Sequence, residues 1–257
     1  MVFAQAIVRT PCRRLTDGLT TAGLGPPDYR RALAQHADYI ATIERCGVAV
    51  SVLPPLDDFP DSTFVEDVAV CTPRCAVITR PGAPSRRDET AHIGDALAAR
   101  YERIATIEAP GTLEGGDVLA VGDHYYIGVT ERTNEEGARQ LIAILERHGM
   151  SGSTVAVADA LHLKTGLAYL EGGALLVAAG FAAPDGLGDC RVIGIDADEA
   201  YAANSVWIND RVLMPAGFPK AREAVEQAGY EVETVEASEF RKLDGGMSCL
   251  SLRLPLP

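Results

Sequence analysis

Short apolar segments separated by polar loops run along the whole chain, and they follow two periods. Short runs rich in Val, Ile and Leu, bounded by Gly, Pro or Asp, predict strands. Longer segments with apolar residues three and four apart predict helices. Helices are expected at residues 28–45, 89–100, 134–148 and 219–228, and strands at residues 4–9, 48–53, 68–71, 76–79, 103–107, 118–121, 125–127, 154–157, 167–170, 175–178, 206–208, 212–214, 231–235 and after Cys249. This mixture is typical of an α/β protein.

A polar loop that leads into a strand hairpin recurs along this pattern. The loops are marked by Asp67, Asp117, His162, Asn204 and Cys249, at intervals of 50, 45, 42 and 45 residues. Repeats of this size are typical of propellers and related arrays. Because equivalent loops of such an array face the same end of its axis, these five side chains are expected to converge on one central cavity. The length allows one large domain or two small ones, and convergence of the five loops on one cavity would make residues 1–257 a single domain built of five α/β units.

Cys249 is the candidate nucleophile of that cavity. It follows Gly245-Gly246, a bend that relaxes the usual limits on φ, and it stands at the start of the last strand. A free cysteine is ordinarily a buried structural residue, so a catalytic role depends on a partner that raises its thiolate fraction. His162 lies in a recurring loop and is the natural partner, and Glu114 or Asp117 would orient its imidazole.

The other histidines and a cysteine pair have simpler interpretations. His36, His92 and His148 fall on predicted helices and are expected at the surface. Cys71 and Cys75 flank a turn, and no second Cys/His pair stands nearby at ligand spacing. These two cysteines are therefore expected to be hairpin residues and not metal ligands.

Composition and charge narrow the class of partner. The 257 residues carry a formal net charge of −13, with 47% hydrophobic and 23% charged residues, a soluble globular composition. The acidity argues against nucleic acid and anionic membranes as partners and permits a small cationic substrate. No export signal and no apolar run long enough to span a bilayer are evident. The six cysteines are expected to be free thiols in a reducing, cytoplasmic compartment.

Three acids, Asp61, Glu66 and Asp67, lie within a short loop beside Phe64-Val65. Acids in a loop are ordinarily solvated, but these stand at the first recurring loop. A guanidinium offers five N–H donors in one plane, which match carboxylates two at a time. Burying such a cation requires several acids, because an unpaired buried charge is costly. The three acids are therefore candidates for binding an organic cation.

Five long motifs, in order along nearly the whole chain, resemble those of bacterial dimethylarginine dimethylaminohydrolases. They are residues 59–67 (FPDSTFVED), 79–87 (TRPGAPSRR), 111–117 (GTLEGGD), 161–166 (LHLKTG) and 245–249 (GGMSC). The resemblance implies the pentein fold, a five-unit α/β propeller with pseudo-five-fold symmetry and a central active-site cavity. It also implies hydrolysis of Nω-methylated L-arginine to L-citrulline and a methylamine through a covalent cysteine adduct, with no metal or organic cofactor.

The resemblance also implies a role for each matching residue. Cys249 corresponds to the nucleophile, His162 to the general acid/base and Glu114 to the acid that supports the histidine. Asp67, with Glu66, corresponds to the carboxylates that hold the substrate guanidinium. The remaining substrate contacts that it implies are Leu19, Asp61, Arg86, Arg132 and the backbone of Leu243, with the two arginines at the α-carboxylate and Asp61 at the α-amino group or its waters. Leu243 stands where the family carries a β-branched residue, a mild departure.

The sequence is also compatible with other activities. An arginine deiminase of the same fold would release ammonia, and an amidinotransferase would pass the adduct to an amine. A guanidine-binding protein without catalysis is a third alternative, against which the intact set of Cys249, His162 and Glu114 argues. Papain-like peptidases carry the cysteine before the histidine, the reverse of the order here. The oligomeric state, with a homodimer as one option, and the preference among methylated arginines are not determined.

Overall fold

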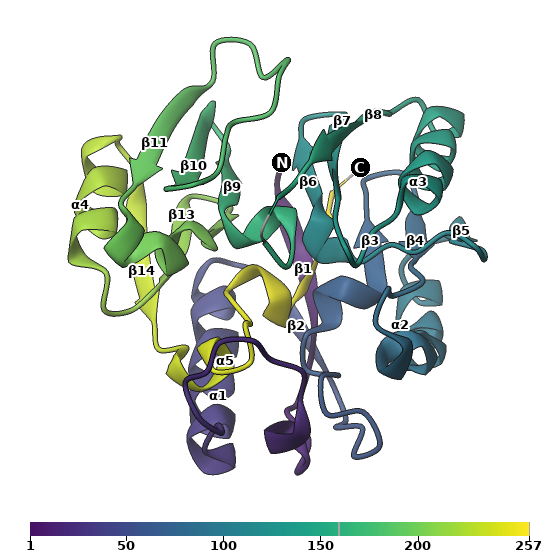
Figure 1. Cartoon of the computed structure of the whole chain (residues 1–257), viewed down its shortest axis with the longest axis horizontal. Helices are drawn as coiled ribbons and strands as arrows, with labels where there is room; N and C mark the ends of the chain where they lie inside the picture. The colour runs from purple at the N-terminus through teal and green to yellow at the C-terminus, as the bar shows by residue number, and fades with distance from the viewer. Residues whose placement is uncertain (159, 257) are drawn as a thin grey trace.

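The computed structural model describes residues 1–158 and 160–256, and this part of the chain forms five three-stranded sheets around a common centre (Figure 1). In each sheet the central strand pairs antiparallel with one neighbour and parallel with the other. The predicted arrangement of five α/β units around an axis is therefore confirmed.

Four sheets are formed by consecutive stretches of chain, and the fifth joins the two ends. The four are β3 (Ala69–Cys71), β4 (Ala76–Ile78) and β5 (Ile104–Thr106); β6 (Val118–Val121), β7 (His124–Val129) and β8 (Ser151–Ala156); β9 (Leu167–Leu170), β10 (Ala174–Ala178) and β11 (Arg191–Ile195); and β12 (Val206–Ile208), β13 (Arg211–Pro215) and β14 (Glu231–Val235). The fifth contains β15 (Leu252–Pro255), β1 (Phe3–Arg9) and β2 (Ala49–Leu53). Pairing of β1 with β15 closes the ring of units.

The α-helices lie at the periphery of the ring (Figure 1). They are α1 (Tyr29–Arg45), α2 (Gly94–Ala98), α3 (Glu135–Arg147), α4 (Pro219–Gln227) and α5 (Ser238–Arg241). The two longest begin at side-chain caps: Asp28 accepts a hydrogen bond from the Arg31 N–H (2.9 Å), and Asn134 accepts one from the Gly137 N–H (2.8 Å). Such caps satisfy N–H groups that have no partner within the helix.

A short 3₁₀ helix precedes the first strand of each unit, and these turns are the recurring polar loops. They are η2 (Val65–Val68), η4 (Gly115–Asp117), η5 (Leu163–Thr165), η6 (Ala197–Ala203) and η7 (Ser248–Leu250). Contacts connect η2 with η4 and η7, and η5 with η4 and η6. The turns therefore meet at the centre of the ring, where the repeat predicted a cavity.

Several segments differ from the sequence prediction, and one of them is α5, which was not expected. The helix expected at residues 89–100 begins earlier as η3 (Pro84–His92), where Pro84 presets φ at the helix start, and only α2 continues it as α-helix. The third unit has no helix between β10 and β11, as the predicted helices imply, but β11 itself was not predicted. Residues 179–190 contain Pro184 and adopt positive φ at several glycines, so a helical period cannot form there.

His36 is buried, and the prediction of a surface position for it was wrong. One side of α1 packs on β2 and β14, and α5 covers a further part of the helix. The His36 ring is 3% exposed and lies 6.4 Å from the ring of Phe240, between centroids. Burial lowers the pKa of His36 to about 4. The helical period identified α1 correctly but did not reveal the second element that covers it.

The cysteine prediction agrees with the structure as far as it describes the chain. Cys71 and Cys75 frame the β3–β4 turn, as predicted, and all six cysteines are free thiols. Within residues 1–158 and 160–256, every helix falls short of the length and apolar character needed to cross a membrane.

Candidate active site

One small cavity collects nine of the ten residues predicted for the site. Its volume is about 30 Å³. The predicted residues that line it are Leu19, Asp61, Asp67, Arg86, Glu114, Arg132, His162, Leu243 and Cys249, and Phe64, Leu161, Asp244 and Gly245 complete the lining. These residues come from four of the five units and from the loops after β1 and α5. Glu66 is the exception, because it lines a different cavity.

Cys249 lies in the first turn of η7 and is 7% exposed. Its Sγ accepts a hydrogen bond from the Gly246 N–H at 3.4 Å. Neither Gly245 nor Gly246 adopts positive φ, so the predicted reason for these glycines was wrong. A Cβ at Gly245 would collide with the Phe64 ring, and one at Gly246 would collide with the Asn204 side chain. The glycines are needed because other groups approach the bend closely.

The Cys249 thiol is neutral in this environment. Burial raises its pKa to about 12, and the negative charges of Glu66 and Asp67 act in the same direction. The Gly246 N–H and the Lys164 ammonium oppose this shift but do not overcome it.

His162 forms a hydrogen-bonded ion pair with Glu114. The distance from His162 Nε2 to Glu114 Oε2 is 2.7 Å, and Asp67 Oδ1 lies 4.0 Å from the same nitrogen. Burial disfavours the charged imidazole, but the Asp67 charge and the Glu114 hydrogen bond outweigh it and raise the His162 pKa to about 9. Burial likewise acts against ionised Glu114, but His162 overcomes it and lowers the Glu114 pKa to about 2. The imidazole is therefore a proton donor at neutral pH.

Asp117, the other acid considered for His162, supports the backbone of the same loop. Its Oδ1 accepts a hydrogen bond from the Leu163 N–H (2.9 Å), and its Oδ2 accepts one from the Thr130 hydroxyl (2.9 Å). Glu114 is therefore the direct partner of the imidazole, and Asp117 fixes the loop in which His162 lies.

Asp67 is held in the cavity by two donors. Arg86 Nη1 donates to its Oδ2 at 2.6 Å, and the Gly116 N–H donates to its Oδ1 at 3.0 Å. Arg86 also donates to Glu89 through Nε and Nη2 and to the Phe64 carbonyl at 3.0 Å. Glu89 was not predicted from the sequence, although its i,i+3 spacing from an arginine was a usable signal. Arg86 is therefore a fixed, buried cation that already neutralises Asp67.

Arg132 and Asp61 are less constrained than Arg86. The side chain of Arg132 is 21% exposed, and its Nη1 lies 3.5 Å from Glu114 Oε1. Asp61 Oδ1 accepts a hydrogen bond from the Leu19 N–H at 3.0 Å. Burial raises the pKa of Asp61, although Arg86 partly offsets this. These groups retain hydrogen-bonding capacity for a ligand.

Glu66 does not point into this cavity, so its predicted place beside Asp67 at a substrate guanidinium does not match the structure. Its Oε1 forms an ion pair with Lys164 Nζ (2.6 Å) and accepts a hydrogen bond from Arg253 Nη2 (2.7 Å). Its Oε2 accepts one from the Ser248 hydroxyl (2.7 Å). Consecutive residues of the 3₁₀ turn η2 project in different directions, which places Glu66 on the other side of the loop from Asp67.

Asn204 and Tyr201 position the nucleophile loop. Asn204 was expected to converge on the central cavity but is not among the residues that line the reactive cavity, and Tyr201 was not predicted. Asn204 accepts a hydrogen bond from the Ser248 N–H (2.9 Å) and donates one to the Lys164 carbonyl (3.0 Å). The Tyr201 hydroxyl donates to the Gly245 carbonyl (2.7 Å). Asn204 marks the fourth recurring loop, so the repeat contained a signal for its position.

Asp67, Glu114 and His162 each place one donor atom within 4.8 Å of the others, a spacing that suits a metal ion. However, Glu114 is hydrogen-bonded to His162, and Asp67 is paired with Arg86. A metal would have to displace these internal cations. The arrangement suits proton transfer and the binding of an organic cation better.

Comparisons with known proteins identify the family. A family model described as arginine deiminase matches residues 50–187. The N(G),N(G)-dimethylarginine dimethylaminohydrolase of Pseudomonas aeruginosa is 54% identical over 253 residues, which cover 98% of this chain and 100% of that protein. The chain belongs to the dimethylarginine dimethylaminohydrolase family.

Solved structures of dimethylarginine dimethylaminohydrolase have the same architecture. A cysteine-to-serine variant of the Pseudomonas aeruginosa enzyme complexed with citrulline matches with a TM-score of 0.97 at 54% identity, covering 99% of this chain and 100% of that one. A crystal structure of a histidine-to-glycine variant, an adduct with S-methyl-L-thiocitrulline, matches with a TM-score of 0.96 at 54% identity, covering 98% and 100%. The pentein fold predicted from the motifs is thereby confirmed.

Proposed function

We propose that this protein hydrolyses Nω-methylated L-arginine to L-citrulline and a methylamine through an adduct on Cys249. The observation that carries the proposal is one buried cavity in which a thiol, an imidazole–carboxylate pair and further acids line the same space. The family relationship supports the same reaction.

The side chains that line the cavity can each be assigned to one part of the substrate. We propose that Asp67 holds the guanidinium and that Asp61 binds the α-amino group or its waters. Arg132, the more exposed arginine, binds the α-carboxylate, and Leu19 and Leu243 make the remaining contacts. Arg86 contributes mainly by fixing Asp67, because most of its donors are already engaged.

The reaction proceeds in two steps. The thiol proton is released as the cationic substrate binds, and the Cys249 thiolate forms a bond to the guanidinium carbon. The carbon–nitrogen bond to the methylated nitrogen breaks, and protonated His162 gives its proton to the leaving amine. His162 then takes a proton from water, which attacks the adduct. The sulfur–carbon bond breaks, the new hydroxyl gives its remaining proton to the departing thiolate, and citrulline is released with the thiol restored.

Substrate binding is also the event that ionises Cys249. In the free protein, burial and two nearby carboxylates keep the thiol neutral. A bound guanidinium places a permanent cation beside the sulfur, and a shift of two pKa units needs only about 2.7 kcal/mol. Thiolate ultraviolet absorbance, titrated with and without a non-reactive amidine and blanked with Cys249→Ser, tests this. Equal Cys249 pKa values in the two states would contradict it.

One assay separates this activity from its rivals. Purified protein is incubated with dimethyl-, monomethyl- and unmethylated arginine, and citrulline, methylamines and ammonia are measured. We expect citrulline and methylamines from the methylated substrates. An arginine deiminase, the second candidate because of the matching family model, would instead favour unmethylated arginine and release ammonia. Amidino transfer to an added amine would indicate the amidinotransferase.

The organisation and location of the protein are part of the proposal. We propose that residues 1–257 act as a single catalytic domain, because the cavity is lined from several units and the two chain ends share a sheet. Six free cysteines support a cytoplasmic site of action. Nucleic acid and membranes are not partners, in keeping with the negative charge. Sedimentation measurements would decide between a monomer and a homodimer.

A further inference from the structure

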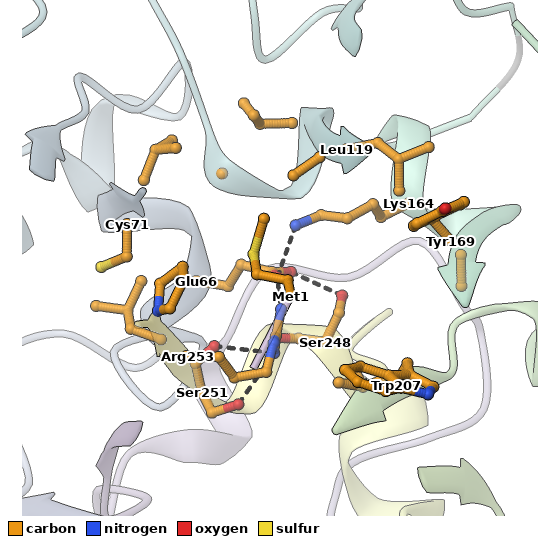
Figure 2. Close-up of a pocket in the computed structure, with 18 of the residues that line it drawn as sticks. Met1, Glu66, Cys71, Leu119, Lys164, Tyr169, Trp207, Ser248, Ser251 and Arg253 are labelled. Atoms are coloured by element: carbon orange, nitrogen blue, oxygen red, sulfur yellow. Dashed lines mark hydrogen bonds and ion pairs between the residues drawn. The ribbon is translucent and has the colours of Figure 1, made fainter. Parts of the chain in front are cut away.

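Glu66 connects three of the loops that carry the reactive residues. Glu66, Lys164 and Ser248 come from η2, η5 and η7, and each stands within two residues of a residue that lines the reactive cavity. Figure 2 shows Lys164 and Ser248 reaching the Glu66 carboxylate from different elements. One buried carboxylate therefore ties the loops of Asp67, His162 and Cys249 together.

Two cations meet this carboxylate. Lys164 Nζ lies 2.6 Å and Arg253 Nη2 lies 2.7 Å from Glu66 Oε1, and Arg253 Nη1 also donates to the Ser248 carbonyl at 3.1 Å (Figure 2). Glu66 is 4% exposed. Burial alone would raise its pKa, but Lys164 and Arg253 outweigh burial and lower it. The carboxylate is therefore ionised, and its charge is balanced by its partners.

The charge balance matters because Cys249 is adjacent to Ser248 and must ionise during the reaction. An unbalanced Glu66 would oppose the thiolate, and the Lys164 ammonium favours it. The titratable and charged groups around Cys249 are Tyr39, Asp61, Glu66, Asp67, Arg86, Glu114, Arg132, His162, Lys164, Tyr201, Asp244 and Arg253. Among these groups, Lys164 belongs to the same loop as His162 and forms an ion pair with Glu66.

We propose that Lys164 is a positioning residue for the reaction of Cys249. Its ammonium helps to neutralise Glu66 and, through Glu66, ties the His162 loop to the Cys249 loop, so that the thiolate forms at a lower cost than beside an unbalanced Glu66 and next to the imidazole. The inference rests on the proposed function, in which Cys249 is the nucleophile. It assigns to Lys164 and Glu66 a role in the chemistry through charge, without contact with the substrate.

Alkylation of Cys249 tests the charge effect without turnover. The rate of iodoacetamide addition to Cys249, measured by peptide mass spectrometry at fixed mildly alkaline pH, follows the thiolate fraction. A shift of one pKa unit changes this rate about three- to tenfold, since lower basicity also weakens the nucleophile. We expect Lys164→Met to slow alkylation, Glu66→Gln to accelerate it, and the double variant to lie near the wild type. Lys164→Arg, which keeps the charge, should also lie near the wild type.

The direction in which each single variant changes the alkylation rate decides the outcome. If Lys164→Met and Glu66→Gln both accelerate alkylation, the network only holds the loops in place and the proposal is wrong. If Lys164→Met does not fold, Glu66→Gln alone decides, because slower or unchanged alkylation would overturn the proposal. Lys220→Met is the matched control: Lys220 forms an exposed ion pair with Asp198, and its removal should leave the rate unchanged.

Turnover provides a second, separate measurement. The acid limb of the kcat–pH profile should move up by on the order of 1 pH unit in Lys164→Met, so that activity lost at neutral pH returns at higher pH. KM should change little. A loss of kcat that is uniform across pH would indicate a purely structural role and contradict the proposal. If the wild type turns over no methylarginine, the proposed function fails, while alkylation still tests Lys164.

Discussion

Two cavities are built on the same central loops, and they differ in how their charges are balanced. In the cavity of Figure 2, Glu66 is paired with Lys164 and Arg253, and Glu171 is paired with the N-terminal ammonium at 2.8 Å. In the reactive cavity the acids outnumber the arginines: Asp61, Asp67, Glu114 and Asp244 face Arg86 and Arg132. Protonation of His162 reduces the excess of negative charge in the reactive cavity.

This contrast explains the protonation states at the reactive cavity. Excess negative charge raises the pKa of His162 to about 9 and contributes to the raised pKa of Cys249. The same excess favours a cationic ligand, because a guanidinium would complete the balance that the other cavity achieves internally. The difference between the cavities is therefore a difference between a network whose charges are balanced internally and a site prepared for a cation.

The nucleophile should give the largest effect. Cys249→Ser should lower kcat by about 10⁴-fold or more, since the hydroxyl cannot replace the thiolate. Substrate binding should persist because the acids remain. Steady-state kinetics measure the loss, and mass spectrometry of acid-quenched wild type should find the adduct on Cys249. An adduct on another cysteine would contradict the assignment.

Removal of the acid/base should have the next largest effect. His162→Ala should lower kcat by about 10²–10⁴-fold with a smaller change in KM, because the imidazole transfers protons in both steps. His124→Ala is a suitable control, since that histidine bonds only to Ser151 and Ser153 among the described residues. A change mainly in KM for His162→Ala would show that the histidine binds substrate instead.

Alanine variants of the two arginines in the reactive cavity should have different effects, one on stability and the other on substrate binding. Arg86→Ala removes the cation shared by buried Asp67 and Glu89 and should lower the free energy of unfolding by about 3–5 kcal/mol. Arg132→Ala should leave stability nearly unchanged and raise KM, because its guanidinium is more exposed and less engaged. Urea unfolding and initial rates measure the two effects. Equal losses of stability would refute this division of roles.

The smallest predicted effect is the pH dependence of stability through His162. Its folded pKa of about 9 lies above the ordinary value of 6.5, so its stabilising contribution is complete below pH 6.5 and is lost as the pH rises through 9. The contribution is at most about 3 kcal/mol. Relative to His162→Gln, the wild type should lose unfolding free energy over this range. A constant difference would show that His162 is neutral in the folded protein.

Much of the site could be predicted because its residues lie at equivalent places in a repeat. The order of polar loop, hairpin and helix is set by local periodicity and turn residues, which a sequence displays directly. The sequence alone therefore placed the loops of Asp67, His162 and Cys249 at one end of a common axis. The motifs then implied a role for each of these residues.

Tertiary structure decided which way neighbouring side chains point and what covers them. Glu66 and Asp67 are adjacent acids in one turn, yet only Asp67 faces the reactive cavity, because the turn geometry directs Glu66 to Lys164 and Arg253. Gly245 and Gly246 are required by the close approach of Phe64 and Asn204, groups distant in the chain. Local pattern thus determined the elements and the candidate residues, whereas long-range packing determined their partners, their burial and hence their charge.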